Sequence, residues 1–306
     1  MQYRKTVLFI RISALILAGL FILGLSAQST QATTRIHSRL KIVAAENFWG
    51  SLAQQIGGNK AAVVSLVKDP NADPHEYESS TATAVEVSDA DYVIYNGAGY
   101  DSWANKLLAS GGYEDRKVLD VAKLLGKKNG DNPHFWYSPE YVDKVALQIK
   151  NDLTRIDPPD SRYFASRYIK LRQSLKIYQD KLASINVQFK GTKVAATEDI
   201  FSYMAKAAGL DLISPPAFIT SVAEGNEPPT ASVVQFQGQL TSNQPRLLVY
   251  NKQTVTPLTD SMKSLALKNS IPIVGITETI QPPNASFQDW MNAQTMILLK
   301  TLEAEK

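Results

Sequence analysis

Two histidines and two glutamates in this sequence stand where a metal-binding site could form. His75 and His134 each follow a proline in a short polar segment, and Glu198 and Glu278 each follow a short apolar run. Imidazole nitrogen and carboxylate oxygen are ligands that suit Zn²⁺, and carboxylates also suit Mn²⁺. Together the four side chains could close a four-ligand site for a divalent transition metal.

Spacing by itself leaves other interpretations of these residues open. The intervals between them match no short metal-binding motif. A histidine after proline in a polar loop is often a surface or capping residue. A glutamate after a strand is often an acid of the first helical turn, where the helix dipole favours it. Whether the four residues meet therefore depends on the elements that carry them.

The segments around these residues alternate between strand and helix patterns. Short apolar runs typical of buried strands occur at Lys41–Ala45, Val63–Val67, Asp91–Tyr95, Lys193–Ala196, Leu247–Tyr250 and Ile271–Ile276. Such alternation predicts mainly parallel sheets flanked by helices, so the fold class is α/β. Ligands in these folds bind just beyond the carboxyl ends of the strands, and His75, Glu198 and Glu278 follow predicted strands.

Three further polar residues, Glu46, Asn96 and Asn251, also end predicted strands. We interpret them as capping residues or as residues that orient the ligating imidazoles.

Helix signals flank the strands. A helix over Phe48–Ile56 would stop at Gly57-Gly58, because glycine readily ends helices. Ser138 followed by Pro139 is typical of a cap and first helical position, and predicts a helix that ends at about Thr154.

A longer helix is expected between two such α/β halves. Apolar residues recur at helical spacing with no glycine or proline among them, at Phe164, Tyr168, Leu171, Leu175, Tyr178, Leu182 and Ile185. A helix over Asp160–Val187 would be roughly 40 Å long and could span two lobes. A coiled-coil dimer seam is the alternative. The aromatic residues in the stripe favour packing on a globular body.

The N-terminal residues are predicted to be an export signal. Arg4 and Lys5 precede an apolar run from Ile12 to Leu25, and small residues follow it. An uncleaved N-terminal anchor is the alternative. Either way we expect the rest of the chain outside the cytoplasm, in the periplasm or on the outer face of the membrane. Because the sequence has no cysteine, the cysteine of a lipoprotein is not expected.

These features predict five segments. They are a signal peptide or anchor over 1–29, a flexible leader over 30–40, an N-terminal α/β lobe over 41–158, a spanning helix over 159–190 and a C-terminal α/β lobe over 191–306.

Composition and missing motifs exclude several classes of protein. The formal net charge is +3, and the N-terminal segment carries three of these charges, so nucleic acid is not an expected partner. The absence of cysteine excludes thiolate metal sites and cysteine nucleophiles. Neither HExxH nor GxSxG occurs, so we expect no enzyme.

From Lys41 onward the sequence resembles the metal-binding solute-binding proteins of bacterial ABC transporters, the ZnuA/TroA-like family. The resemblance rests on an ordered set of motifs: Ala44-Ala45-Glu46-Asn47-Phe48-Trp49, Asp73-Pro74-His75-Glu76-Tyr77-Glu78, Asn96-Gly97-Ala98-Gly99-Tyr100-Asp101, Asn132-Pro133-His134-Phe135-Trp136 and Thr277-Glu278-Thr279.

This resemblance implies two α/β lobes joined by one long helix, with a metal held in the interlobe cleft. It implies His75, His134 and Glu198 as ligands, and Glu278 at a fourth position that is usually Asp. It also implies delivery of the metal to a membrane permease with its cytoplasmic ATPase, by a protein that we expect to be a monomer.

Two questions stay open at this point. The cargo is zinc or manganese, because zinc outcompetes manganese at nitrogen–oxygen sites and ligand type alone does not name it. The alternative function is a cell-surface adhesin or interaction protein with a structural metal site, in which the four ligands would be replaceable without loss of adhesion.

Overall fold

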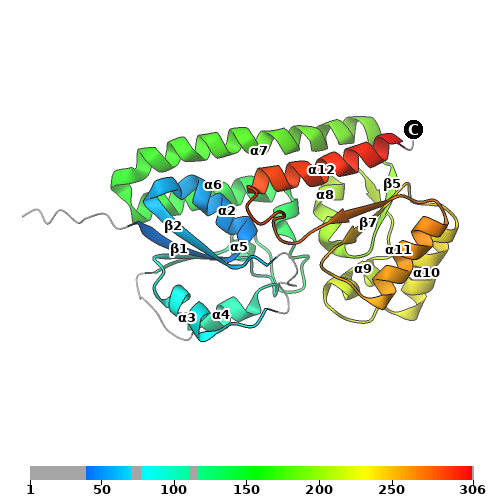
Figure 1. The fold of residues 1–306 in the computed structure, drawn as a ribbon, viewed down its shortest axis with the longest axis horizontal. Helices are drawn as coiled ribbons and strands as arrows, with labels where there is room; N and C mark the ends of the chain where they lie inside the picture. The colour runs from blue at the N-terminus through cyan, green and yellow to red at the C-terminus, as the bar shows by residue number, and fades with distance from the viewer. Residues whose placement is uncertain (1–38, 70–76, 110–115, 305–306) are drawn as a thin grey trace, which may run out of the picture. The chain divides into compact units, whose positions relative to one another are not determined.

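The computed structural model describes residues 39–69, 77–109 and 116–304, and from Arg39 onward the chain forms one compact unit. Within the described residues there are two four-stranded parallel sheets. Helices flank both sheets, as Figure 1 shows. The predicted α/β class with two mainly parallel sheets is therefore confirmed.

The first sheet has the order β2-β1-β3-β4 and defines the N-terminal lobe. Its strands are β1 (Leu40–Glu46), β2 (Ala61–Val67), β3 (Tyr92–Tyr95) and β4 (Lys117–Asp120). The helices of this lobe are α2 (Asn47–Gly57), α3 (Thr81–Ser88), α4 (Ser102–Ala109), α5 (Val121–Leu124) and α6 (Pro139–Ile156).

The second sheet has the order β6-β5-β7-β8 and defines the C-terminal lobe. Its strands are β5 (Lys193–Ala196), β6 (Asp211–Leu212), β7 (Leu248–Asn251) and β8 (Ile273–Ile276). The helices that follow these strands are α8 (Ser202–Ala207), α9 (Pro216–Ala223), α10 (Thr230–Thr241) and α11 (Pro257–Lys268).

The local helix signals act as predicted. Glycine ends α2, with Gly58 at a φ of 54° that side-chain-bearing residues rarely adopt. The Ser138 hydroxyl accepts a hydrogen bond from Tyr141 N at the start of α6, and Pro139 is the first helical residue.

The long helix is α7 (Ser161–Phe189), whose 29 residues give a length of about 43 Å. Six of the seven stripe residues are buried and Tyr168 is partly buried against the same core. Since this face packs within its own chain, it is not available as the seam of a coiled-coil dimer. Figure 1 shows α7 extending over both lobes, as predicted.

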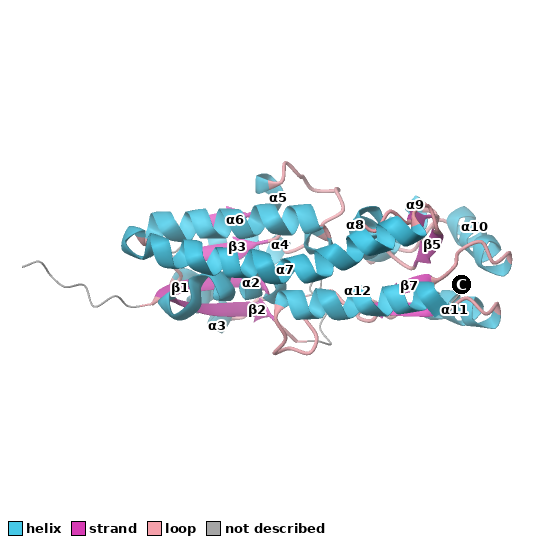
Figure 2. Ribbon diagram, turned by 90° about the horizontal axis from the view of Figure 1, so that it is seen from above, coloured by secondary structure: helices cyan, strands magenta, loops and turns pink. Residues whose placement is uncertain are grey.

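The C-terminal helix α12 (Phe287–Ala304) lies alongside α7, as the views in Figure 1 and Figure 2 agree. The chain reaches α12 by returning to the N-terminal lobe after β8. Ile280 N donates to Asn47 Oδ1 (3.1 Å), and Phe287 N donates to Ser51 Oγ (3.0 Å). Within the described residues, therefore, the chain passes between the lobes in α7, in residues 277–286 and again in α12.

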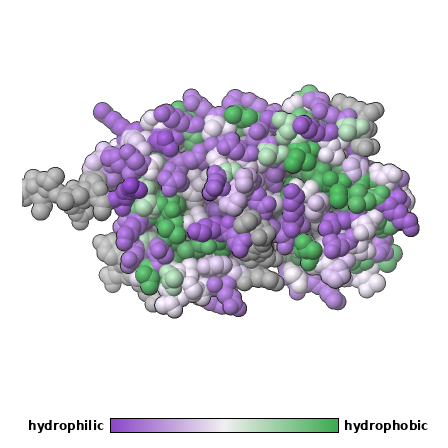
Figure 3. Space-filling view, in the orientation of Figure 1, coloured by the Kyte–Doolittle hydropathy of each residue, from purple (hydrophilic) through white to green (hydrophobic). Residues whose placement is uncertain are grey.

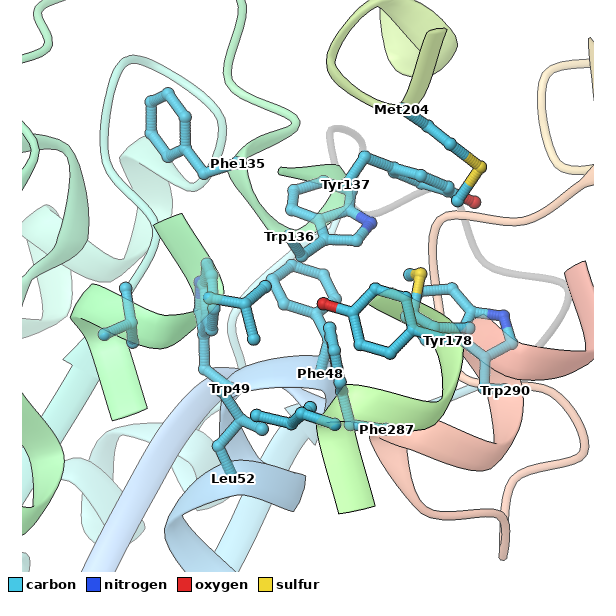
Figure 4. Close-up of a cluster of buried hydrophobic side chains, with 14 of the residues drawn as sticks. Phe48, Trp49, Leu52, Phe135, Trp136, Tyr137, Tyr178, Met204, Phe287 and Trp290 are labelled. Carbon is cyan, nitrogen blue, oxygen red and sulfur yellow. The ribbon is translucent and has the colours of Figure 1, made fainter. Parts of the chain in front are cut away.

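Aromatic side chains fill the core beneath these crossing segments (Figure 4). The rings of Phe48 and Trp136 stack with their centroids 4.0 Å apart, and Trp290 packs edge-on against Tyr137 and Phe287. The four tryptophans of the chain are all buried. This cluster joins α2, the turn Phe135–Tyr137 and α12 into one core. Trp136 of this core packs against the ring of His134.

None of the described helices combines the length with the apolar character needed to cross a membrane. The face in Figure 3 is largely polar, with apolar residues in separate patches.

The predicted signal peptide or anchor over 1–29 and most of the leader over 30–40 lie outside the described residues. The predicted boundaries at 158 and 190 stay predictions, because the described residues form one compact unit.

Candidate metal centre

The structure brings three of the four predicted ligands together. His134, Glu198 and Glu278 each offer a ligand atom, and these atoms all lie within 4.8 Å of one another. The three residues are almost completely buried, with at most 1% of their surface exposed. His75 lies outside the described residues, so its part in this cluster stays a prediction.

Parallel strands and short helical turns position the three side chains. Glu198 follows β5 and precedes the turn Asp199–Phe201, while Glu278 follows β8. Because β7 lies between β5 and β8, the carboxyl ends of these strands share one edge of the sheet. His134 comes from the other lobe and precedes the turn Phe135–Tyr137.

The imidazole of His134 is held through its Nδ1 atom. Asn132 Oδ1 lies 2.9 Å from Nδ1, and Asp199 Oδ1 lies 3.0 Å from the same atom. Asn132 is itself oriented, because its Nδ2 donates to the backbone oxygen of Asp199 (2.8 Å). Both of these neighbours of Nδ1 are acceptors, so in the neutral ring Nδ1 carries the proton and Nε2 carries the lone pair that a metal would bind.

Nε2 of His134 faces the two glutamates. It lies 4.0 Å from Glu278 Oε1. The ring edges of Tyr100 and Trp136 flank the imidazole, with centroids 6.1 and 5.3 Å away. The two aromatic contacts fix the plane of the ring.

The two glutamates are connected by Asn251 at the end of β7. Asn251 Nδ2 lies 2.8 Å from Glu198 Oε1 and 2.7 Å from Glu278 Oε1, and donates to both. Tyr100 from the N-terminal lobe donates its hydroxyl proton to Glu278 Oε2 at 2.6 Å. Glu198 Oε2 is buried and has no hydrogen-bond partner within the described residues.

Burial and the neighbouring charges shift the pKa values of His134 and Glu198. Burial alone would lower the pKa of His134, but Asp199 and the charges of Glu278 and Glu198 raise it to about 9. Burial, and then the charge of Glu278, raises the pKa of Glu198 to about 8. In the metal-free protein His134 and Glu198 therefore bind protons more tightly than free side chains do. A divalent cation would replace these protons and neutralise the carboxylates.

Asn96 and Glu46, the other polar residues predicted at strand ends, contact neighbouring segments and not the imidazole of His134. Asn96 accepts from Trp49 Nε1 (3.1 Å) and donates to Pro133 O (2.9 Å), which fastens the loop before His134. Glu46 is fully buried beside Asp101, and burial followed by the Asp101 charge raises the pKa of Glu46 well above its usual range. Within the described residues, Asn132 and Asp199 hold Nδ1 of His134, and the rings of Tyr100 and Trp136 flank its imidazole.

Sequence reasoning thus missed three residues that act at the site. No role was predicted for Asn132, Asp199 or Tyr100. Asn132 stands two residues before His134, the spacing at which an asparagine side chain bonds to the backbone ahead of it, and its Oδ1 does accept from His134 N (2.9 Å). Asp199 is adjacent to Glu198, but nothing in the sequence indicates that it meets a residue of the other lobe.

Comparison with known proteins gives the same picture of the fold. The sequence profile of the family described as zinc-uptake complex component A, periplasmic, matches residues 42–301. A solved structure of the substrate-binding protein FpvC from Pseudomonas aeruginosa in complex with Mn²⁺ superposes with a TM-score of 0.73. It covers 88% of this chain and 100% of its own, at 17% sequence identity.

Two relatives are named for the metals that they carry or bind. The manganese ABC transporter substrate-binding lipoprotein PsaA of Streptococcus mitis is 26% identical over 77% of this chain and 78% of its own length. The zinc-binding lipoprotein AdcA of Streptococcus pneumoniae is 25% identical over 95% of this chain and 61% of its own length. These relatives do not favour the adhesin alternative. The chain belongs to the zinc-uptake component A family, which consists of substrate-binding proteins of metal ABC importers and not of enzymes.

Proposed function

We propose that this chain captures Zn²⁺ or Mn²⁺ outside the cytoplasmic membrane with His75, His134, Glu198 and Glu278, and delivers the ion to an ABC permease with its cytoplasmic ATPase. The observation that carries the proposal is the buried cluster of His134, Glu198 and Glu278. Burying two carboxylates together is costly unless a positive charge accompanies them. A divalent ion supplies that charge.

The donor set suits such an ion. Neutral Nε2 of His134 and the partnerless Oε2 of Glu198 are the kinds of atom that zinc binds at about 2.0–2.2 Å. Ligands of a tetrahedral zinc stand roughly 3.4 Å apart at those bond lengths, so atoms that lie within 4.8 Å of one another would approach by at most about 1.4 Å. His75 is the predicted fourth ligand.

The sequence and the relatives support the proposed cellular setting. The predicted export signal over 1–29 would place the folded part in the periplasm or on the outer face of the membrane. The relatives PsaA and AdcA are lipoproteins, whereas this sequence contains no cysteine for a lipid. We propose a monomer as the working form, since the α7 stripe is used within the chain.

The deciding experiment is elemental analysis. The chain is stripped with a chelator, dialysed against equal zinc and manganese, and compared with the double variant His75→Ala plus His134→Ala. We expect one equivalent of metal in the unmodified protein and almost none in the variant. A matched variant, with exposed Ile177 and half-buried Gln179 of α7 changed to Ala, should keep its metal. Failure of the unmodified protein to retain either metal at neutral pH would overturn the proposal.

A further inference from the structure

Loop 96–101, which follows β3, has a backbone that proteins rarely adopt. The three residues Gly97–Gly99 all have positive φ, at 76°, 56° and 90°, and Ala98 adopts this conformation although it carries a side chain. Such a backbone persists only where its surroundings hold it. At the end of the loop, the Tyr100 hydroxyl donates to Glu278 Oε2 of the other lobe (2.6 Å). Whatever holds the loop therefore also supports this contact.

Asp101 ties the end of the loop to its beginning. Its two carboxylate oxygens accept hydrogen bonds from Asn96 N (2.6 Å) and Gly97 N (2.8 Å), and the residue is fully buried. Backbone N–H donors favour the ionised form of a carboxyl. Burial raises the pKa of Asp101 to about 6, so at neutral pH Asp101 is mainly the carboxylate that these two bonds require.

A second buried carboxyl, that of Glu46, lies beside Asp101. The register between β1 and β3 pairs Ala44 with Ile94, which brings Glu46 at the end of β1 to the level where loop 96–101 begins. Glu46 has no exposed surface, and its two carboxyl oxygens have no hydrogen-bond partner among the donors of the described residues. The side chains of Glu46 and Asp101 lie within hydrogen-bonding reach of each other.

Two carboxyls in this position share a proton. Ionised carboxyls are acceptors only, so a hydrogen bond between Glu46 and Asp101 exists only when one of them is protonated. Two adjacent negative charges are also unfavourable in a buried place, and the neighbouring charges that act on Glu46, those of Asp101 and Glu278, are both negative. Because two backbone N–H groups stabilise the ionised form of Asp101, the proton resides on Glu46.

We infer that Glu46 is a neutral carboxylic acid that donates its proton to Asp101, and that this acid pair holds loop 96–101 in the shape that brings Tyr100 to Glu278. Glu46 is then a positioning residue, because it acts on the candidate metal centre through the loop and not by touching an ion. A buried site can keep a carboxylic acid neutral so that it serves as a hydrogen-bond donor. The inference goes beyond the proposed function, since it concerns the protein before any ion is bound.

The first test is infrared spectroscopy of the metal-free protein at neutral pH. A protonated carboxyl has a carbonyl band at higher frequency than carboxylates and amides, and the band shifts in D₂O. We expect part of this band to disappear in Glu46→Gln. The difference spectrum is needed because Glu198, with a pKa of about 8, contributes a protonated carboxyl of its own. Glu86→Gln changes an exposed glutamate of α3 and should leave the band unaltered.

The second test asks whether Glu46 supports the Tyr100 contact, by urea unfolding of metal-free variants. Glu46→Leu has no donor for Asp101, whereas the side-chain amide of Glu46→Gln still has one. In the Glu46→Leu background, we expect Tyr100→Phe to cost less than about half of the unfolding free energy that it costs in the unmodified protein, because coupled residues are not additive. In the Glu46→Gln background it should cost its full amount. Glu46→Ala takes the place of Glu46→Leu if that variant does not fold.

Tyr137→Phe is the matched control for the second test. It also removes a buried hydroxyl that bridges the lobes, but that hydroxyl donates to the backbone oxygen of Thr277 (2.8 Å) and does not belong to loop 96–101. Its cost should be the same in all backgrounds.

The outcomes separate the two parts of the inference from each other and from the proposed function. Identical infrared spectra of the unmodified protein and Glu46→Gln overturn the neutral state of Glu46. An equal cost of Tyr100→Phe with and without a donor at residue 46 overturns its support of the loop. Both tests use the metal-free protein, so either failure leaves the transport function standing, and a failure to bind metal leaves this inference standing.

Discussion

Asp199 Oδ1 lies 3.0 Å from Nδ1 of His134, although the two residues come from different lobes. A carboxylate in this place stabilises the ring tautomer in which Nε2 carries no proton, and it raises the basicity of that nitrogen. The C-terminal lobe therefore helps to prepare a ligand that the N-terminal lobe supplies.

Replacing this carboxylate should weaken metal binding without unfolding the protein. We expect Asp199→Asn to raise the zinc Kd by about 10-fold to 100-fold, the usual effect of losing a partner behind a ligating histidine. Competition with a fluorescent chelator measures the change. Asp211→Asn alters an exposed residue of β6 and serves as the control. Equal affinities in the two variants would contradict this role for Asp199.

Asn251 should contribute most to the free energy of unfolding when the protein is metal-free. Asn251→Ala removes the donor that two buried carboxylate oxygens share, and leaving buried groups without partners costs about 1–3 kcal/mol. We expect the metal-free variant to lose about that much of its free energy of unfolding in urea, and saturating zinc to restore part of it.

Asn292→Ala is the matched change for this experiment, because Asn292 on α12 accepts from Lys181 away from the site. Zinc should stabilise it as it does the unmodified protein. If the losses in Asn251→Ala were identical with and without zinc, Asn251 would be a general structural residue and not a support of the two glutamates.

Metal binding should release protons and become tighter as the pH rises. In the metal-free protein the pKa of His134 is about 9 against an ordinary 6.5, and that of Glu198 is about 8 against 4.5. Both groups hold protons more tightly when folded. Their contributions to stability are therefore complete at low pH and are lost as the pH rises, between about 4.5 and 8 for Glu198 and between about 6.5 and 9 for His134.

Zinc requires the deprotonated forms, so its affinity should rise over the same range. Calorimetry at neutral pH in buffers of different ionisation enthalpy would count the protons released. The expectation fails if the observed heat is the same in every buffer.

The core under α7 should be sensitive to truncation. Leu175 is fully buried, and Leu175→Ala should cost about 2–5 kcal/mol of the free energy of unfolding. Ile177, two residues away, is 56% exposed, and Ile177→Ala should change stability by less than about 0.5 kcal/mol. Urea unfolding followed by circular dichroism tests both, and similar losses in the two variants would refute the inward orientation of the stripe.

Most of the fold could be predicted because its elements are buried and strongly patterned. The six predicted strands are central or long enough to form apolar runs, and the spacing from Phe164 to Ile185 identified α7. The edge strands β4 and β6 were missed. β4 has four residues with Lys117 and Asp120 at its ends, and β6 is a two-residue strand that begins with exposed Asp211, so neither leaves an apolar run in the sequence.

The site likewise contains residues that the sequence predicted and contacts that it did not. Glu198 and Glu278 were predictable because they follow strands that end at one edge of a sheet. The anchoring of Glu278 by Tyr100, and of His134 by Asp199, joins residues of different lobes. Such pairs depend on how the lobes pack, which hydrophobic patterns along the chain do not encode.

The chain passes between the lobes in α7, in residues 277–286 and in α12, and this has a consequence for the speed of metal capture. Wide separation of the lobes would have to bend two helices and pull Ile280 from Asn47 at the same time. Binding then does not wait for a closing motion. In stopped-flow mixing, the observed association rate should increase in proportion to the metal concentration, with no plateau from a slow rearrangement of the protein.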